Sequence, residues 1–297
     1  MTEPVEDEAQ ETTALVLRTL SSGVNPGPWP QPYPTTVETA IEWQKTGVHA
    51  TWSEMHGATH GLPKGRLSEL IGRVAATGEQ LGLAWTCEQD MRLWLDPSAP
   101  TGDRRSTSAR ALAEITGYYA ISAGHGLANV TLRTLLVHPD AAAIINKDNK
   151  SAQGFAPFSS VPAVWVPLNE KVAKLLKAAA LPVGQPSVDR MVDYVLTLTG
   201  HPHWQALTSR RHVDFHRWRP QSVVGGVATH NPWEEGADGS STLTMYGSSQ
   251  HQPPETQELI DEASAGLAVL AETMADWMAA WPAALRELGV PVFKEEA

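Results

Sequence analysis

The pattern that most constrains this chain is a long amphipathic segment near its C-terminus. Apolar side chains recur there at spacings of three and four, the period of one face of an α-helix. They are Ile260, Ala263, Leu267, Leu270, Met274, Trp277, Trp281 and Leu285. Pro254 and Glu255 can start this helix, and Gly289 with Pro291 can end it. A helix with so wide an apolar face must bury it against a core or a partner helix.

Apolar residues at helical spacing also recur in most of the chain upstream of this segment. They predict helices over residues 36–48, 66–80, 83–95, 107–136, 168–180, 188–199 and 203–218. Ser106 or Thr107 can cap the fourth of these helices, and Asn169 can cap the fifth. Strands do not alternate with helices along the chain, so a parallel sheet is not expected. The sequence therefore predicts a mainly all-α protein built as a helical bundle.

The helix predicted over 107–136 combines an apolar face with weak intrinsic stability. Its inward stripe is predicted to consist of Leu112, Ile115, Tyr119, Leu127 and Val130. Gly117, Gly124 and Gly126 lower its helix propensity. Neighbouring elements are therefore expected to pack closely against this helix.

Composition divides the chain into three parts. Residues 1–34 form an acidic tail followed by a proline-rich arm that cannot be helix or central strand. Residues 35–100 form an N-terminal helical region. Residues 101–291 form the main helical domain.

The main domain contains an insertion over residues 220–254. This segment is rich in Gly, Ser and Pro and has two β-like runs, Ser222–Ala228 and Ser241–Tyr246. We expect it to be a β-hairpin or a long loop placed before the last helix.

The net charge of −11 limits the partners that this chain can take. Five acids lie in the first eleven residues, which contain no Lys or Arg, and the chain stays acidic without them. An acidic protein is a poor general binder of polyanions. A role with nucleic acid would therefore need a local basic patch.

Three features of the sequence indicate a cytoplasmic protein without membrane association. No run of eighteen apolar residues occurs, so no membrane-spanning helix is expected. The N-terminus is acidic, whereas a secretory signal would be basic and then apolar. Cys87 is the single cysteine, which excludes an internal disulfide and suits a reducing compartment.

A cluster of Arg and His residues lies in and just beyond the helix predicted over 203–218. Its members are Arg210, Arg211, His212, His216, Arg217 and Arg219. A neutral His is a general base for a ribose 2′-hydroxyl near pH 7. An Arg guanidinium can hold phosphate oxygens and stabilise the charge that develops on them. Because the 2′-hydroxyl is itself the nucleophile, such cleavage of RNA needs no metal ion.

The segment from Arg211 to His216 has the form Arg, four residues, His. In this it resembles the HEPN superfamily, whose α-helical domains are marked by an Arg, four to six residues and a His. A small polar residue or a His often follows the Arg in that family, and His212 stands there in this chain. The order of elements is also similar: a long early helix, the motif on a later helix, and a long closing helix. The resemblance covers residues 105–290 by layout and six residues by motif.

Resemblance to the catalytic HEPN members implies a metal-independent endoribonuclease that uses no cofactor. It also implies a homodimer in a toxin or antiviral defence setting, with an antitoxin or another defence protein as partner. His216 would be the base and Arg211 the phosphate clamp. Contacts to RNA would come from Arg210, His212, Arg217 and Arg219. Some toxin members carry a Tyr two residues after the His; this chain has Trp218 there, which puts regulation through that Tyr in doubt.

Further side chains can support the cluster. Trp218 can stack on a base. His125 and Asn129 are polar residues one turn apart on the helix predicted over 107–136. They can face the cluster, or they can form a buried hydrogen-bonded pair with no catalytic role. Cys87 is expected to be a core thiol rather than a nucleophile.

Other interpretations of the histidines and arginines remain open. The basic residues can be a solvated helix end that meets acids elsewhere. His212 and His216 have the spacing of a metal-binding pair, but Asp214 lies on the other side of the helix and the arginines repel a cation. No metal site is predicted there, and none at the pairs His56 with His60 or His201 with His203.

Two other functions are compatible with the sequence. The first is a non-catalytic HEPN-like module that binds RNA or a nucleotide. The second is a helical interaction or structural subunit that docks a partner through the apolar face of its C-terminal helix.

Overall fold

The described part of the chain is mainly helical, as the sequence predicts. The computed structural model describes residues 34–55, 66–95, 103–148, 165–216, 233–235, 241–243 and 256–290. Its helices are α2 (Thr35–Met55), α3 (Arg66–Leu95), α4 (Asp103–Leu135), α5 (Pro139–Asp148), α6 (Glu170–Ala180), α7 (Pro186–Gly200), α8 (Pro202–His216) and α9 (Thr256–Glu287). The mainly all-α fold class is therefore confirmed.

Two short strands lie within the predicted insertion. β1 (Trp233–Glu235) pairs antiparallel with β2 (Ser241–Leu243), and Trp233 is opposite Leu243. β2 lies in the second predicted β-like run. Its partner is not the first run, residues 222–228, which falls outside the described residues.

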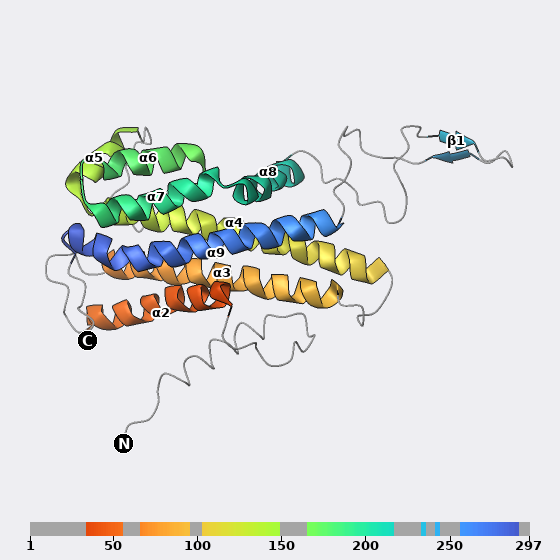
Figure 1. Cartoon of the computed structure of the whole chain (residues 1–297), viewed down its shortest axis with the longest axis horizontal. Helices are drawn as coiled ribbons and strands as arrows, with labels where there is room; N and C mark the ends of the chain where they lie inside the picture. The colour runs from red at the N-terminus through yellow and green to blue at the C-terminus, as the bar shows by residue number, and fades with distance from the viewer. Residues whose placement is uncertain are drawn as a thin grey trace, which may run out of the picture.

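Three long helices, α3, α4 and α9, run side by side along the length of the bundle (Figure 1). α2 packs against α3, and α5, α6 and α7 lie on the opposite side (Figure 1). α9 contacts α2, α3, α4, α7 and α8, so the last helix occupies the centre of the bundle. None of the helices in the described ranges combines the length and the apolar composition that crossing a membrane requires.

The apolar stripe predicted for the last helix is buried in the core. Its residues, from Ile260 to Leu285, are each at most 5% exposed. Most belong to one hydrophobic cluster that also takes in residues of α2, α3, α4, α6, α7 and α8. Ile260 and Ala263 join a smaller cluster with Met91 and Ala109. The helices of the predicted N-terminal region therefore share their core with the rest of the described bundle.

Three tryptophans form the aromatic centre of this core and connect α2, α4 and α9. The Trp277 ring centroid lies 5.0 Å from that of Trp43 and 5.4 Å from that of Trp281. Trp43 Nε1–H donates to the Met274 carbonyl oxygen at 3.1 Å, and Trp281 Nε1–H donates to Thr134 Oγ1 at 3.0 Å. Trp277 is fully buried, and its Nε1–H has no hydrogen-bond partner in the described part of the chain.

Glycines bring neighbouring helices close together at two points near this centre. A Cβ atom at Gly78 of α3 would lie 2.6 Å from Trp43 Cβ and 2.9 Å from the Ala40 carbonyl oxygen of α2. A Cβ atom at Gly126 of α4 would lie 2.3 Å from Thr77 Oγ1 of α3. The second contact confirms that neighbours pack closely on the glycines of α4.

Two helix ends follow the local chemistry that the sequence predicts. Asn169 Oδ1 accepts a hydrogen bond from the Val172 N–H at 2.9 Å and so caps α6. Gly289 follows α9 with a φ of 79°, a conformation that favours glycine.

The start of α7 is capped from the far end of the chain. The side chain of its N-cap residue, Gln185, makes no capping hydrogen bond. Instead, Glu287 Oε2 of α9 accepts hydrogen bonds from the backbone N–H groups of Ser187, at 2.9 Å, and Val188, at 3.1 Å. A carboxylate at a helix N-terminus also interacts favourably with the helix dipole.

Several details of the helices differ from the sequence predictions. α4 begins at Asp103, so Ser106 and Thr107 lie inside the helix and neither is its N-cap. α5 lies in a stretch for which no helix is predicted. α3 is continuous where a break after residue 80 is predicted, because packing along α2 and α4 outweighs the low helix propensity of Gly82. α2 continues to Met55, beyond the predicted end at 48. Ile115 is 42% exposed, so its predicted place on the inward stripe of α4 is wrong. Small side chains, including Ala113 and Thr116, face the core there because the helices pack closely.

Candidate functional site on helix α8

Helix α8 carries the start of the Arg/His cluster and begins at a sharp turn. His201 has extended backbone dihedrals, as expected for a residue before proline, so α7 ends and α8 begins at Pro202. The His203 N–H donates to His201 Nδ1 at 3.3 Å, and the two rings lie 5.3 Å apart. This hydrogen bond uses one ring nitrogen of His201 in the turn itself.

Two apolar side chains attach the first half of α8 to the bundle. Trp204 and Leu207 are both buried. Trp204 fits against Gly124 of α4, where a Cβ atom would lie 2.2 Å from Trp204 Cη2. Leu207 fits between Gly117 of α4 and Gly266 of α9, where Cβ atoms would lie 3.1 Å and 2.7 Å from its methyl carbons. Glycine at these positions therefore creates the surface on which α8 rests.

An ion pair attaches α8 one turn further along. Arg210 Nη2–H donates to Glu262 Oε1 at 2.6 Å, and Arg210 Nε–H donates to Glu262 Oε2. Both side chains are about three-quarters buried, at 22% and 25% exposed. The guanidinium is therefore committed to α9, and a contact from Arg210 to RNA would require exchange of this carboxylate for a phosphate.

For three other members of the cluster, the structure describes the helix backbone but not the side chains. Arg211, His212 and His216 lie on α8, so the predicted motif occupies one continuous helix. Their side chains fall outside the described residues, and so do Arg217, Trp218 and Arg219. The convergence of Arg211 and His216 on one phosphate, and the stacking role of Trp218, stay predictions.

His125 and Asn129 hold the segment that precedes α6. Asn129 Nδ2–H donates to the Val166 carbonyl oxygen at 2.8 Å, and its Oδ1 accepts from the Val166 N–H at 3.1 Å. His125 Nδ1 accepts from the Leu168 N–H at 2.9 Å. The two side chains thus replace the partners that a neighbouring strand would give to an extended backbone. These contacts identify a structural role for the pair.

We expect Asn129→Leu to free this extended segment without unfolding the bundle. The change removes both hydrogen bonds to Val166 and leaves the backbone groups unpaired, at a cost of about 1–3 kcal/mol. Hydrogen exchange at the Val166 and Leu168 amides should become faster, whereas exchange in the centre of α9 should not change. Asn129→Asp is the matched control, because it keeps the acceptor for the Val166 N–H. The Val166 amide should therefore exchange more slowly in Asn129→Asp than in Asn129→Leu. Equal protection in Asn129→Leu and wild type would contradict the assignment.

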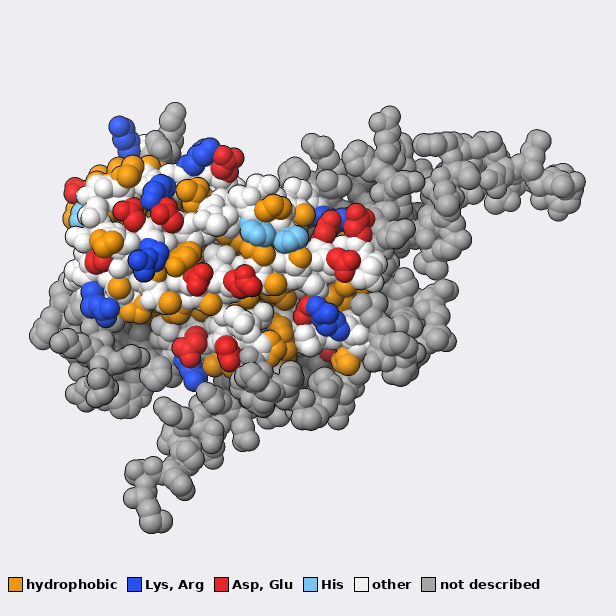
Figure 2. Space-filling view, viewed as in Figure 1, with side chains coloured by type: hydrophobic (Ala, Val, Ile, Leu, Met, Phe, Trp, Pro, Cys, Tyr) orange, Lys and Arg blue, Asp and Glu red, His pale blue; other side chains and the backbone are white. Residues whose placement is uncertain are grey.

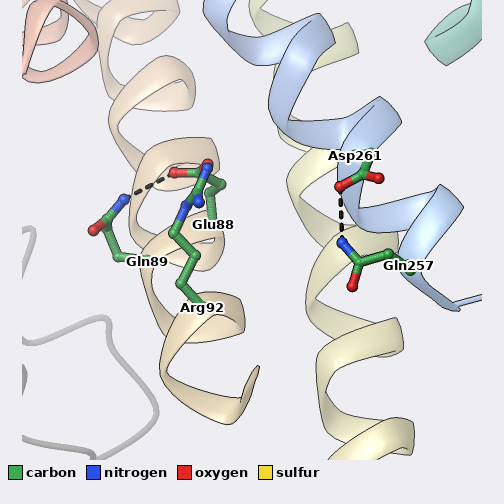
Figure 3. A network of polar contacts seen from close by, with 5 residues as sticks. All are labelled: Glu88, Gln89, Arg92, Gln257 and Asp261. Atoms are coloured by element: carbon green, nitrogen blue, oxygen red, sulfur yellow. Dashed lines mark hydrogen bonds and ion pairs between the residues drawn. The ribbon is translucent and has the colours of Figure 1, made fainter. Parts of the chain in front are cut away.

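Acidic residues gather near the start of α9, and one of them, Glu262, pairs with Arg210 of α8. Glu258, Asp261 and Glu262 all lie in its first two turns, where they interact favourably with the helix dipole. Asp261 accepts a hydrogen bond from Gln257 at 2.8 Å (Figure 3). On α3, Glu88 likewise accepts from Gln89 at 2.8 Å and from Arg92 Nη2 at 2.6 Å (Figure 3).

One face of the described bundle carries mixed charges. Figure 2 shows Lys and Arg side chains interspersed with Asp and Glu over the described part of this face, without a wide patch of one sign. The described part of this face therefore offers a polyanion no wide patch of positive charge.

Cys87 is a poor nucleophile in the folded protein. Burial of the thiol and the nearby negative charge of Asp90 raise its pKa from 9.0 to about 11. This agrees with the predicted core thiol.

We expect Cys87 to react with iodoacetamide about 100-fold more slowly at pH 8 than a thiol with a pKa of 9, because the thiolate fraction falls by that factor. The rate should keep rising with pH up to about 11. Urea-unfolded protein is the control and should react at the rate of a free thiol. Because the folded pKa lies above the unfolded one, the contribution of the thiol to stability is full below pH 9 and declines as the pH rises toward 11. Fast alkylation that reaches its plateau near pH 9 would contradict this environment.

Within the described ranges, no group of three or more His, Cys, Asp or Glu side chains is placed to hold a metal ion. His56 and His60 lie outside those ranges, and so do the side chains of His212 and His216. The fold and the site together define a class: a helical bundle with a short Arg/His-bearing helix docked on α4 and α9. Comparisons with protein-family models, with curated proteins and with solved structures found no match to this chain.

Proposed function

We propose that this protein is a metal-independent endoribonuclease of HEPN type. The observation that supports the proposal is the location of Arg211 and His216 on a single helix, α8, whose preceding turns are anchored to α4 and α9. A catalytic pair must be held in a fixed geometry to work, and a helix docked on a rigid bundle is a suitable support.

In the proposed reaction His216 accepts the proton of a ribose 2′-hydroxyl. The 2′-oxygen attacks phosphorus, the bond from phosphorus to the 5′-oxygen breaks, and the leaving oxygen takes a proton from water. Arg211 holds the non-bridging oxygens as their negative charge grows. The products are a 2′,3′-cyclic phosphate and a 5′-hydroxyl. His212, Arg217 and Arg219 contact the RNA, and Arg210 joins them only if it leaves Glu262.

The cellular setting is part of the same proposal. By its resemblance to catalytic HEPN proteins, the chain acts as a cytoplasmic homodimer that pairs two motifs. It serves as a toxin or antiviral defence effector, with an antitoxin or another defence protein as partner.

The test is cleavage of RNA in the presence of EDTA. Wild-type protein should yield fragments with 5′-hydroxyl ends, and Arg211→Ala/His216→Ala should be at least about 100-fold slower. Arg190→Ala/His203→Ala is the matched control, because it removes one Arg and one His that are exposed and lie outside the motif. This control should cleave at the wild-type rate.

Each other outcome excludes a specific function. If wild type and Arg211→Ala/His216→Ala leave RNA equally intact, the proposed ribonuclease function is wrong. Salt-dependent RNA binding without cleavage would favour the non-catalytic module. Docking of a partner through the apolar face of the C-terminal helix has little support, because that face is buried within this chain.

A further inference from the structure

The described side-chain contacts that hold α8 on α4 and α9 lie before the motif. Among the α8 residues whose side chains are described, Trp204 and Leu207 are the buried apolar ones. Both lie in the first half of the helix, ahead of Arg211. The next contact to the bundle is the ion pair between Arg210 and Glu262, immediately before the motif begins.

The contacts of α8 with α9 follow an antiparallel register. Leu207 rests on Gly266, and Arg210 meets Glu262, so a step of three residues along α8 matches a step of four back along α9. Two contacts one turn apart on both helices define the direction of α8 relative to α9. Without the ion pair, the described side-chain contacts would hold only the first half of α8, through Trp204 and Leu207, and the second half could pivot about them.

The geometry of the ion pair suits a positioning role. The two N–H groups of the Arg210 guanidinium meet the two oxygens of Glu262, which fixes the rotation of the planar group as well as its distance. Both side chains are largely buried, so water screens the pair less than it would a surface ion pair. This burial also limits exchange of the carboxylate for an incoming phosphate.

We propose that Glu262 is a positioning residue: through Arg210 it fixes the second half of α8 and so sets the placement of Arg211 and His216. This inference rests on the proposed ribonuclease function for its effect on catalysis. Glu262 touches neither RNA nor the reacting atoms in this scheme. It acts through the helix that carries them.

The experiment compares wild type with Glu262→Gln in two measurements. Hydrogen exchange at the backbone amides of residues 211–216 should become about tenfold faster, because a charge-assisted contact that limits local opening is lost. For cleavage of a defined RNA, kcat should fall about tenfold while KM stays close to the wild-type value. A loss of this kind separates placement of the catalytic pair from substrate binding.

Two further variants make the result specific. The exchanged pair Arg210→Glu/Glu262→Arg should restore part of the amide protection and part of kcat. Asp193→Asn is the matched control, since it breaks the ion pair of Asp193 with Lys177 between α7 and α6, at 2.8 Å. That change should leave exchange at residues 211–216 and kcat unaltered.

The outcomes distinguish failure of this inference from failure of the proposed function. Wild-type cleavage with unchanged exchange and kcat in Glu262→Gln refutes the positioning role and leaves the ribonuclease intact. Tighter RNA binding or faster cleavage by Glu262→Gln also refutes it, because Glu262 would then compete with phosphate for Arg210. If wild type does not cleave but Glu262→Gln raises exchange at 211–216, the ribonuclease is refuted and the hold of Glu262 on α8 is supported.

Discussion

Trp277→Ala is expected to lower the free energy of unfolding by about 3–5 kcal/mol, a large part of the total for a protein of this size. Trp277 is fully buried between Trp43 and Trp281, where α2 and α9 meet. Removal of its ring loses the free energy gained by transferring this large apolar side chain from water to the core. It also leaves a cavity that the packed helices α2, α4 and α9 cannot close. The midpoint and slope of urea unfolding, followed by far-ultraviolet circular dichroism, measure the loss.

A pair of Trp→Phe variants tests the polar part of the same cluster. Trp277→Phe removes an indole N–H that has no partner in the described part of the chain, whereas Trp43→Phe removes a hydrogen bond to Met274. Trp277→Phe should therefore cost less stability than Trp43→Phe, although both replace a buried Trp by the same side chain. A loss below about 1 kcal/mol for Trp277→Ala would show that this cluster is not central to the core.

Gly78→Ala is expected to destabilise the protein by about 1–3 kcal/mol, although alanine is the better helix former. The added methyl would meet Trp43 Cβ and the Ala40 carbonyl oxygen, both within 3 Å. Neither atom can move without the backbone of α2, so α2 and α3 must separate. Calorimetric or chemical unfolding measures the change.

The matched control for Gly78 lies on the same helix. Gly72 is exposed in the interior of α3, and a Cβ atom there would meet nothing within 4 Å. Gly72→Ala should therefore stabilise the protein by about 0.5–1 kcal/mol through the helix propensity alone. If Gly72→Ala and Gly78→Ala change the free energy of unfolding in the same direction, close packing at Gly78 does not determine the result of Gly78→Ala.

The helices and the core of this protein follow largely from local patterns. All eight residues that the apolar period of three and four placed on the inward face of the last helix are buried, because burial of that face is the dominant requirement on its sequence. Asn169 and Gly289 were identifiable as helix ends because capping needs specific local chemistry. Ile115 was misplaced because the choice of inward face on α4 depends on how closely its neighbours pack, which one helix does not reveal.

The contacts that define the candidate site are not local, and the sequence did not indicate them. Arg210 and Glu262 are 52 residues apart, and Asn129 is 37 residues from the backbone that it binds. Nothing near Glu262 distinguishes it from the other acids at the start of α9. Likewise, His125 and Asn129 stood out as polar residues on an apolar helix, but their partners depend on the path of the chain before α6.

The central place of α9 has a consequence for how the protein is made. α9 is synthesised after every other described helix, yet it packs against α2, α3, α4, α7 and α8 and supplies Trp277 and Trp281 to the core. The growing polypeptide must therefore expose the apolar surface of α2, α3, α4 and α7 that α9 covers until this helix leaves the ribosome. Glu262 and Gly266 arrive with it, so α8 gains its contacts with α9 only after α9 has left the ribosome. A nascent chain that has not yet released α9 would thus hold the Arg/His helix only through α4 and α7, and the proposed nuclease would be silent at that stage.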